Sequence, residues 1–262
     1  MNHLRSVARD WLPALDPCEL FRRSGMEPDP WQQQLLRSTA KRILLNCTRQ
    51  GGKSTATAAR GLWEALYRPG SLVLLVSVSQ RQSAELLRRL KALYRPFAEA
   101  FPTESETVLQ LELRNGSRVL SLPSDSGTLR GYAGPSLVVL DEASRVRDEV
   151  LDALTPMLAT SDGTLIVLST PAGKRGIFYS LWTEGGPEWQ RLTVRADDCP
   201  RHGQAFLASE RRRMGDRIFS EEYGAAFVDE EENRSNPRLL SARAAEYLRA
   251  MVAEDGPEAM PE

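Results

Sequence analysis

The chain has 262 residues, of which 26% are charged and 41% are hydrophobic, as is ordinary for a soluble globular protein. Basic and acidic side chains number 34 and 35, so the net charge of −1 indicates no partner and does not favour a protein that grips nucleic acid over its whole surface. Three scattered cysteines and two histidines argue against a zinc site or a disulfide framework, and no apolar run has the length of a membrane span or the form of a signal peptide. We therefore expect a cytoplasmic protein that does not enter a membrane.

The elements that the sequence predicts are those of an α/β protein. Helices are expected at residues 31–39, 54–67, 82–93, 150–158, 206–214 and 220–227. Strands are expected at residues 43–45, 72–78, 108–113, 118–122, 137–140 and 165–168, with an edge strand at 189–194. Asn115-Gly116 predicts a hairpin, whereas the other strands are short apolar runs that alternate with helices. This order predicts a mainly parallel central sheet covered by helices on both faces.

The same pattern divides the chain into three parts. Residues 1–28 are expected to form a short helical lead-in that ends at two prolines, and residues 29–230 form the α/β domain. Residues 231–262 follow an acidic run and form a tail. This tail holds a candidate helix at 236–252 and an end that is expected to be disordered because it is rich in proline, glutamate and glycine.

A glycine-bearing loop joins the strand at 43–45 to the helix at 54–67. It fits the phosphate-loop pattern G-x-x-x-x-G-K-[ST] at every position except the first, which is Cys47. Glycines let backbone N–H groups turn toward phosphate oxygens, Lys53 is placed to reach the β- and γ-phosphates, and the Ser54 hydroxyl can bind Mg²⁺. The alternative is a glycine-rich turn that merely precedes a helix. The predicted ATP contacts here are Thr48, Arg49, Gln50, Gly51, Gly52, Lys53, Ser54 and Thr55.

Two acidic residues, Asp141 and Glu142, end the buried strand at 137–140. A parallel strand delivers its carboxyl end to the edge of the sheet where nucleotides bind. Asp141 can hold Mg²⁺ there with Ser54, and Glu142 can polarise the water that attacks the γ-phosphate. Alternatively, the pair only caps the next helix. Together with the phosphate loop, the pair predicts a P-loop NTPase that binds and hydrolyses ATP.

A polar pair, Ser169-Thr170, ends the strand at 165–168. Hydroxyl groups at a strand end can sense the γ-phosphate or its attacking water through hydrogen bonds. An ordinary exit from strand to loop, turned by the following proline and glycine, would give the same pattern.

These motifs in this order resemble the ATPase domain of phage large terminase subunits, the motors that pump DNA into empty capsids. The likeness covers residues 28–230. The segments that carry it are Asp29-Pro30-Trp31-Gln32, Arg49-Gln50-Gly51-Gly52-Lys53-Ser54, Leu122 to Asp125, Leu129-Arg130-Gly131-Tyr132, Leu137 to Ala143, Leu168-Ser169-Thr170-Pro171, Gly176 to Tyr179, and Glu222 to Val228.

The resemblance implies roles that spacing alone does not. Gln32 would read adenine, with Gln33 and Gln34 as neighbours in a shifted register, or it would simply lie on a solvated helix face. Arg49 would touch the γ-phosphate. Arg130 would act as an arginine finger on the nucleotide of a neighbouring subunit, the alternative being a surface arginine that stabilises a turn.

The resemblance also implies partners and a location. These are double-stranded DNA, a portal and a small terminase subunit, in the host cytoplasm, with the chain forming a homo-oligomeric ring when assembled and a monomer as the alternative when isolated. About thirty residues follow Asp229, too few for a second domain core, so no nuclease activity is predicted for this chain. Two other functions stay open: a terminase-derived ATPase that acts as a switch or defence component, and a nucleotide-binding module with weak hydrolysis.

Overall fold

A computed structural model of the chain describes residues 12–229. The predicted tail at 231–262, with its candidate helix at 236–252, lies outside the described residues, as does the first part of the predicted lead-in. The α-helices are α2 (Glu19–Arg23), α3 (Pro30–Arg37), α4 (Lys53–Tyr67), α5 (Gln80–Tyr94), α6 (Ser126–Leu129), α7 (Glu149–Ala159), α8 (Gly176–Glu184) and α9 (Gln204–Glu222). The strands are β1 (Arg42–Cys47), β2 (Leu72–Ser77), β3 (Thr103–Thr107), β4 (Gln110–Leu113), β5 (Arg118–Pro123), β6 (Leu137–Leu140), β7 (Thr164–Ser169) and β8 (Trp189–Val194). Short 3₁₀ turns are η1 (Arg95–Phe97), η2 (Ala143–Arg145) and η3 (Ala196–Asp198).

The strands form one sheet in the order β3-β4-β5-β2-β6-β7-β1-β8. The six strands β5-β2-β6-β7-β1-β8 of this order are all parallel to one another. The hairpin of β3 and β4 adds two antiparallel strands at one edge. The predicted fold class, a mainly parallel α/β sheet, is confirmed by this topology, and β8 lies at an edge as the sequence predicts.

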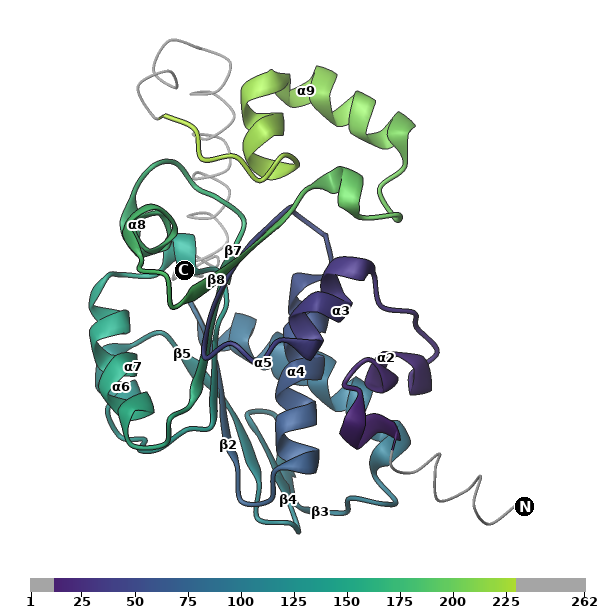
Figure 1. Ribbon diagram of the computed structural model, residues 1–262, viewed down its shortest axis with the longest axis vertical. Coiled ribbons are helices and arrows are strands. Elements are labelled where there is room, and N and C mark those ends of the chain that lie inside the picture. Colours follow the sequence, from purple (N-terminus) through teal and green to yellow (C-terminus); the bar gives the residue numbers. More distant parts are fainter. Residues whose placement is uncertain (1–11, 230–262) are drawn as a thin grey trace, which may run out of the picture. The chain divides into compact units, whose positions relative to one another are not determined.

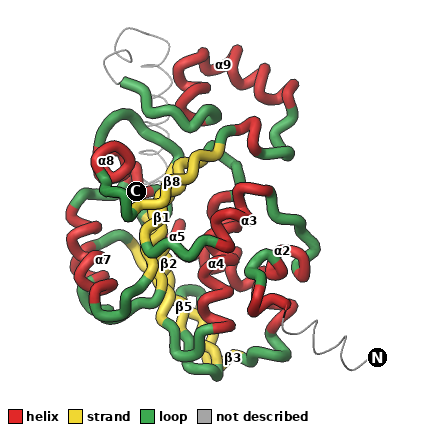
Figure 2. Tube along the Cα trace, in the orientation of Figure 1, coloured by secondary structure: helices red, strands yellow, loops and turns green. Residues whose placement is uncertain are grey.

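Helices cover both faces of the sheet, with α3, α4 and α5 on one side and α7 and α8 on the other (Figure 1). The strands run as a single layer between them (Figure 2). Side chains of β2 alternate between the two cores, since Val73 and Leu75 pack on the first face and Leu74 and Val76 on the second. The central strands are therefore buried on both faces, which explains why they appear in the sequence as unbroken apolar runs.

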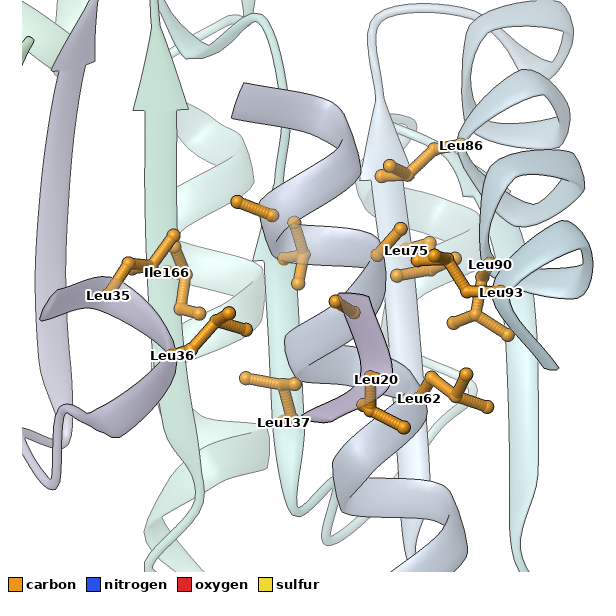
Figure 3. Packing of buried hydrophobic residues seen from close by; sticks show 14 of the residues in the cluster. Leu20, Leu35, Leu36, Leu62, Leu75, Leu86, Leu90, Leu93, Leu137 and Ile166 are labelled. Carbon is orange, nitrogen blue, oxygen red and sulfur yellow. The ribbon is translucent and has the colours of Figure 1, made fainter. Parts of the chain in front are cut away.

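The larger core is built mainly from leucines. In Figure 3, Leu35 of α3, Leu62 of α4 and Leu90 of α5 lie in one cluster with Leu75 and Ile166 of the sheet, and all of these side chains are fully buried. Burying a leucine stabilises a fold by roughly 1.5–3 kcal/mol. Since β1 and α4 belong to this core, it fixes the two elements that flank the phosphate loop.

Some elements differ from those that the sequence predicts. The helix predicted at 220–227 is wrong, because α9 starts at Gln204 and ends at Glu222, with a break at Gly215, where φ is +81°. Strand β3 was not predicted, because its side chains are polar and largely exposed and give no apolar alternation. Helix α8 was not predicted either. None of the helices in residues 12–229 combines the length and apolar character that a bilayer-spanning helix requires.

Candidate nucleotide-binding site

The phosphate loop lies between the buried strand β1 and the first turn of α4, as the sequence predicts. Gln50 and Gly52 have positive φ values of 54° and 95°, so the chain turns back before the helix begins at Lys53. A Cβ on Gly51 would lie 2.8 Å from Thr48 Cγ2 and 2.9 Å from Cys47 Sγ, closer than a Cβ atom tolerates. The loop therefore needs glycine at position 51, and it directs the positive end of α4 outward for an anion.

The sheet order places β7 between β1 and β6, so three predicted motifs meet at one edge. Lys53 Nζ donates to Thr170 Oγ1 at 3.2 Å and lies 3.5 Å from Glu142 Oε1. Ser54 Oγ donates to Asp141 Oδ2 at 3.2 Å. The fold thus brings together residues that are up to 117 positions apart in the sequence.

Asp141 is the most buried acid of this group. Burial raises the pKa of its carboxyl to about 6, and the neighbouring charge of Glu142 acts in the same direction, while Lys53 acts in the opposite direction. Glu142 is only partly buried, and its backbone is left-handed with φ of 55°. Its N–H donates to Asp141 Oδ1 at 2.9 Å, which stabilises this turn. A non-glycine residue in this conformation costs about 1 kcal/mol or more, and such strain clusters at functional sites.

Behind the acidic pair lies a hydroxyl network that the sequence did not reveal. Ser144 N donates to Ser169 Oγ at 3.2 Å, the two hydroxyl oxygens lie 2.7 Å apart, and Ser144 Oγ donates to the Thr170 carbonyl oxygen at 3.0 Å. Ser144 therefore links the segment after β6 to the end of β7. The only signal for it in the sequence is its position two residues after Glu142.

The first of the three glutamines of α3 faces the phosphate loop. Gln32 is buried, and its Nε2 lies 3.5 Å from the Gly52 carbonyl oxygen, while its Oε1 accepts from Asp29 N at 2.9 Å. Gln33 instead donates to the Pro28 carbonyl oxygen at 3.0 Å, and Gln34 is exposed. The solvated-face alternative for Gln32 is therefore wrong, and Gln32 is the glutamine that lies at the loop.

The two arginines named from the family resemblance lie apart from this cluster. Arg49 is 61% exposed, and its Nη1 lies 3.5 Å from Glu222 Oε2 at the end of α9. Its backbone N–H donates to the Glu222 carbonyl oxygen at 2.8 Å, and Thr48 Oγ1 approaches the same oxygen at 3.3 Å. Arg130 follows α6 and is exposed, and within residues 12–229 no hydrogen bond or ion pair joins it to the cluster.

Two further residues beside the loop come from the last third of the chain. Glu222 holds Arg49, and Arg201 contacts the Gly51 carbonyl oxygen at 3.4 Å through Nη1. Both lie well beyond the phosphate loop and the acidic pair, so no local pattern in the sequence pointed to these contacts. The remaining predicted contacts are Gln50, which is exposed in the loop, and Thr55, which is half-buried in the first turn of α4.

Comparisons with known proteins identify the family of this chain. A family model described as the terminase large subunit, T4likevirus-type, N-terminal, matches residues 44–236. The large terminase subunit of Thermus phage G20c is 26% identical over 246 residues, which cover 80% of this chain and 50% of that protein. The chain thus spans about half the length of the curated relatives that it matches.

Solved structures show the same fold. The large terminase ATPase domain of Thermus phage P74-26 superposes with a TM-score of 0.70 at 25% identity, covering 79% of this chain and 97% of that one. The large terminase of another thermophilic bacteriophage, solved in complex with ADP, has a TM-score of 0.65 at 10% identity, covering 77% and 54%. With the family match extending over most of the sequence, the chain belongs to the T4likevirus-type large terminase subunits and corresponds to their N-terminal part.

Proposed function

We propose that this chain is the motor part of a large terminase, which hydrolyses ATP with Mg²⁺ and uses the energy to move double-stranded DNA into a phage capsid. The observation that carries the proposal is a cluster of four side chains at one edge of the sheet. Lys53 contacts Glu142 at 3.5 Å, and Ser54 contacts Asp141 at 3.2 Å. An amine, a hydroxyl and two carboxylates at a helix N-terminus are the groups that phosphoryl transfer needs.

The chemistry of the donors supports a magnesium site. Ser54 Oγ and Asp141 Oδ2 lie 3.2 Å apart and are both oxygen donors, which Mg²⁺ prefers. A buried carboxylate whose pKa is raised is costly to keep ionised, and a divalent cation beside it would offset that cost. Bound there, Mg²⁺ would neutralise charge on the β- and γ-phosphates.

The residues of the cluster divide the work. Lys53 is held between Glu142 and Thr170, and we expect it to exchange these partners for the β- and γ-phosphates when ATP binds. That exchange would free the Glu142 carboxylate to orient and deprotonate the attacking water. Ser169 and Thr170 would sense the γ-phosphate, and Ser144 would carry the change to the segment after β6.

Three residues complete the proposed site from its margins. Gln32 keeps one amide hydrogen and one acceptor lone pair for the edge of adenine, because its present hydrogen bonds use only half of its capacity. Arg49 would leave Glu222 for the γ-phosphate. Arg130 would act in trans as a finger in a homo-oligomeric ring, a role that its exposure permits.

The partners and the place of action follow from family membership rather than from the site. Large terminases package DNA, so we propose double-stranded DNA, a portal and a small terminase subunit as partners, in the host cytoplasm. The same membership supports a packaging motor over a switch or defence component. These proposals are drawn from complete large terminase subunits, and the match to this chain covers about half the length of such a relative.

Nucleotide affinity of Lys53→Ala tests the proposed site. The substitution removes the main point charge for the phosphates, so calorimetry with Mg-ATP should show affinity reduced by about tenfold or more. Lys41→Ala is the matched control, because Lys41 lies at the far end of β1 and pairs with Asp162. Equal ATP affinity of the parental chain and the Lys53 variant would overturn the assignment.

A further inference from the structure

Arg201 reaches the phosphate loop from a part of the chain that carries no nucleotide motif. Strand β8 ends at Val194, the turn η3 follows, and Cys199 is buried with its Sγ 3.8 Å from the Gly51 carbonyl oxygen. Burial raises the pKa of the Cys199 thiol to about 11, so it packs as a neutral group. Cys199 thus anchors the loop beneath Gly51 and places Arg201, two residues on, beside it.

The Arg201 guanidinium has two partners. Its Nη2 forms an ion pair with Asp29, the residue that precedes α3, and its Nη1 donates to the Gly51 carbonyl oxygen at 3.4 Å. Asp29 N in turn donates to Gln32 Oε1 at 2.9 Å. Arg201 therefore bridges the glutamine that we assign to adenine and the loop that we assign to phosphates.

Gln32 and Arg201 approach the same point of the loop. A Cβ on Gly52 would lie 2.8 Å from Gln32 Nε2 and 2.9 Å from Arg201 Nη1, so both nitrogens border the backbone immediately before α4. A Cβ there would displace the ends of both side chains, and φ of 95° at this position favours glycine. The ends of the two side chains thus lie next to each other at the phosphate loop, Gln32 buried and Arg201 partly exposed.

The Arg201 side chain is held by its partners and still stays partly exposed. Its Nη2 and Nη1 nitrogens are engaged by Asp29 and Gly51, which orients the guanidinium, while 41% of the side chain stays exposed. A planar guanidinium held in this way stacks well on aromatic rings, which an ammonium does not reproduce.

We propose that Arg201 is a nucleotide-binding residue whose guanidinium face stacks on the purine base while Gln32 reads its edge. The inference rests on the nucleotide binding proposed above and assigns to this site a base-binding surface formed by α3 and the loop after η3. Arg201 would determine how tightly a purine is held, and Gln32 which purine is preferred.

Binding of three ligands to the full chain tests this assignment: ATP, GTP and ribose 5-triphosphate. Their affinities are measured by calorimetry in the presence of Mg²⁺. The last ligand keeps the sugar and the phosphates and lacks only the base. Arg201→Ala and Arg201→Lys should weaken ATP and GTP by roughly threefold to thirtyfold, the range of a cation–π contact, and change ribose 5-triphosphate by less than about twofold. Arg212→Ala, an exposed arginine of α9, is the charge-matched control and should change none of them.

Other outcomes separate the possible failures. If all three ligands weaken alike, Arg201 acts on phosphates or only supports the loop, and the stacking role is wrong. If Arg201→Lys binds ATP as the parental chain does, charge is sufficient and the plane is not used. Should the parental chain bind none of the ligands, the proposed function fails and takes this inference with it. The Lys variant keeps the charge that pairs with Asp29, so it remains informative if the Ala variant melts early.

Discussion

The two sides of the candidate site are built differently. On the phosphate side, Lys53, Ser54 and Asp141 are largely buried and come from the ends of strands and the start of α4. On the margin, Arg49, Arg130 and Arg201 are exposed arginines on loops. Rigid elements position the first group before any ligand arrives, whereas in the second group the exposed Arg49 can exchange its partner Glu222.

This difference suggests a division of labour. Under the proposed function, the buried cluster would hold ATP and polarise it in every subunit, whereas the arginines would respond to the nucleotide or to a neighbouring subunit. In Figure 1, α9 lies beyond the carboxyl end of β8, and it carries Glu222, which holds Arg49. The margin therefore depends on the last third of the described residues as much as on the motifs.

The largest effect on ATP hydrolysis is expected from Arg130, the arginine proposed to act between subunits. Arg130→Ala should leave ATP binding by the isolated chain intact and lower hydrolysis by a factor on the order of 10³ or more under conditions in which subunits assemble. The parental rate per subunit should rise with protein concentration, and the rate of the variant should stay flat.

Mixing variants checks the trans geometry. Arg130→Ala mixed with Glu142→Gln should recover some activity, because a subunit with an intact base can lie beside one with an intact finger. Arg147→Ala, another exposed arginine, is the control for lost charge. A mixture that stays inactive while parental protein is assembled and active would contradict the trans assignment.

A smaller loss is expected inside the buried cluster. Glu142→Gln keeps size and shape but cannot accept a proton, so hydrolysis should fall by about 10²–10⁴-fold while ATP stays bound. Steady-state phosphate release and calorimetry measure the two quantities separately. Glu149→Gln on the exposed start of α7 is the matched control. Hydrolysis near the parental rate would move the role of the base to another residue.

Gly51→Ala tests how tightly the loop is packed. The added Cβ would lie within 3 Å of side-chain atoms of Thr48 and Cys47, so we expect a cost of about 1–3 kcal/mol and a matching loss of ATP affinity. Cys47→Ala in the same chain should restore part of that affinity because it removes one of the two contacts. Gly203→Ala, which meets nothing within 4 Å, should be neutral. Full affinity in Gly51→Ala would show that the loop rearranges freely.

The sequence predicts the buried side of the site far better than the margin. Strands β1, β2, β6 and β7 contain apolar runs, and parallel strands present their carboxyl ends at one edge of a sheet. The sequence therefore predicts that Ser54 lies near Asp141, and the two are joined by a hydrogen bond. Strand β3 escaped prediction because it is held by backbone pairing at an exposed edge rather than by apolar side chains. Pairings such as Arg49 with Glu222 are 173 positions apart and depend on where α9 ends, which periodicity alone did not define.

The smallest effect concerns the ion pair of Arg49 and Glu222. Because Arg49 is 61% exposed and the charged atoms are 3.5 Å apart, the pair should contribute less than about 1 kcal/mol to stability, and Glu222→Gln should hardly change the melting temperature.

If Arg49 must leave Glu222 to reach the γ-phosphate, the same substitution should raise ATP affinity by up to about fivefold, the equivalent of about 1 kcal/mol, and leave ADP affinity unchanged. Arg49→Ala should do the reverse and reduce the preference for ATP over ADP. Asp216→Asn, at an exposed acid of α9 that pairs with Arg211, serves as the control. Calorimetry with both nucleotides decides the matter, since an equal change for ATP and ADP would mean that Glu222 supports the loop itself and that Arg49 does not respond to the γ-phosphate.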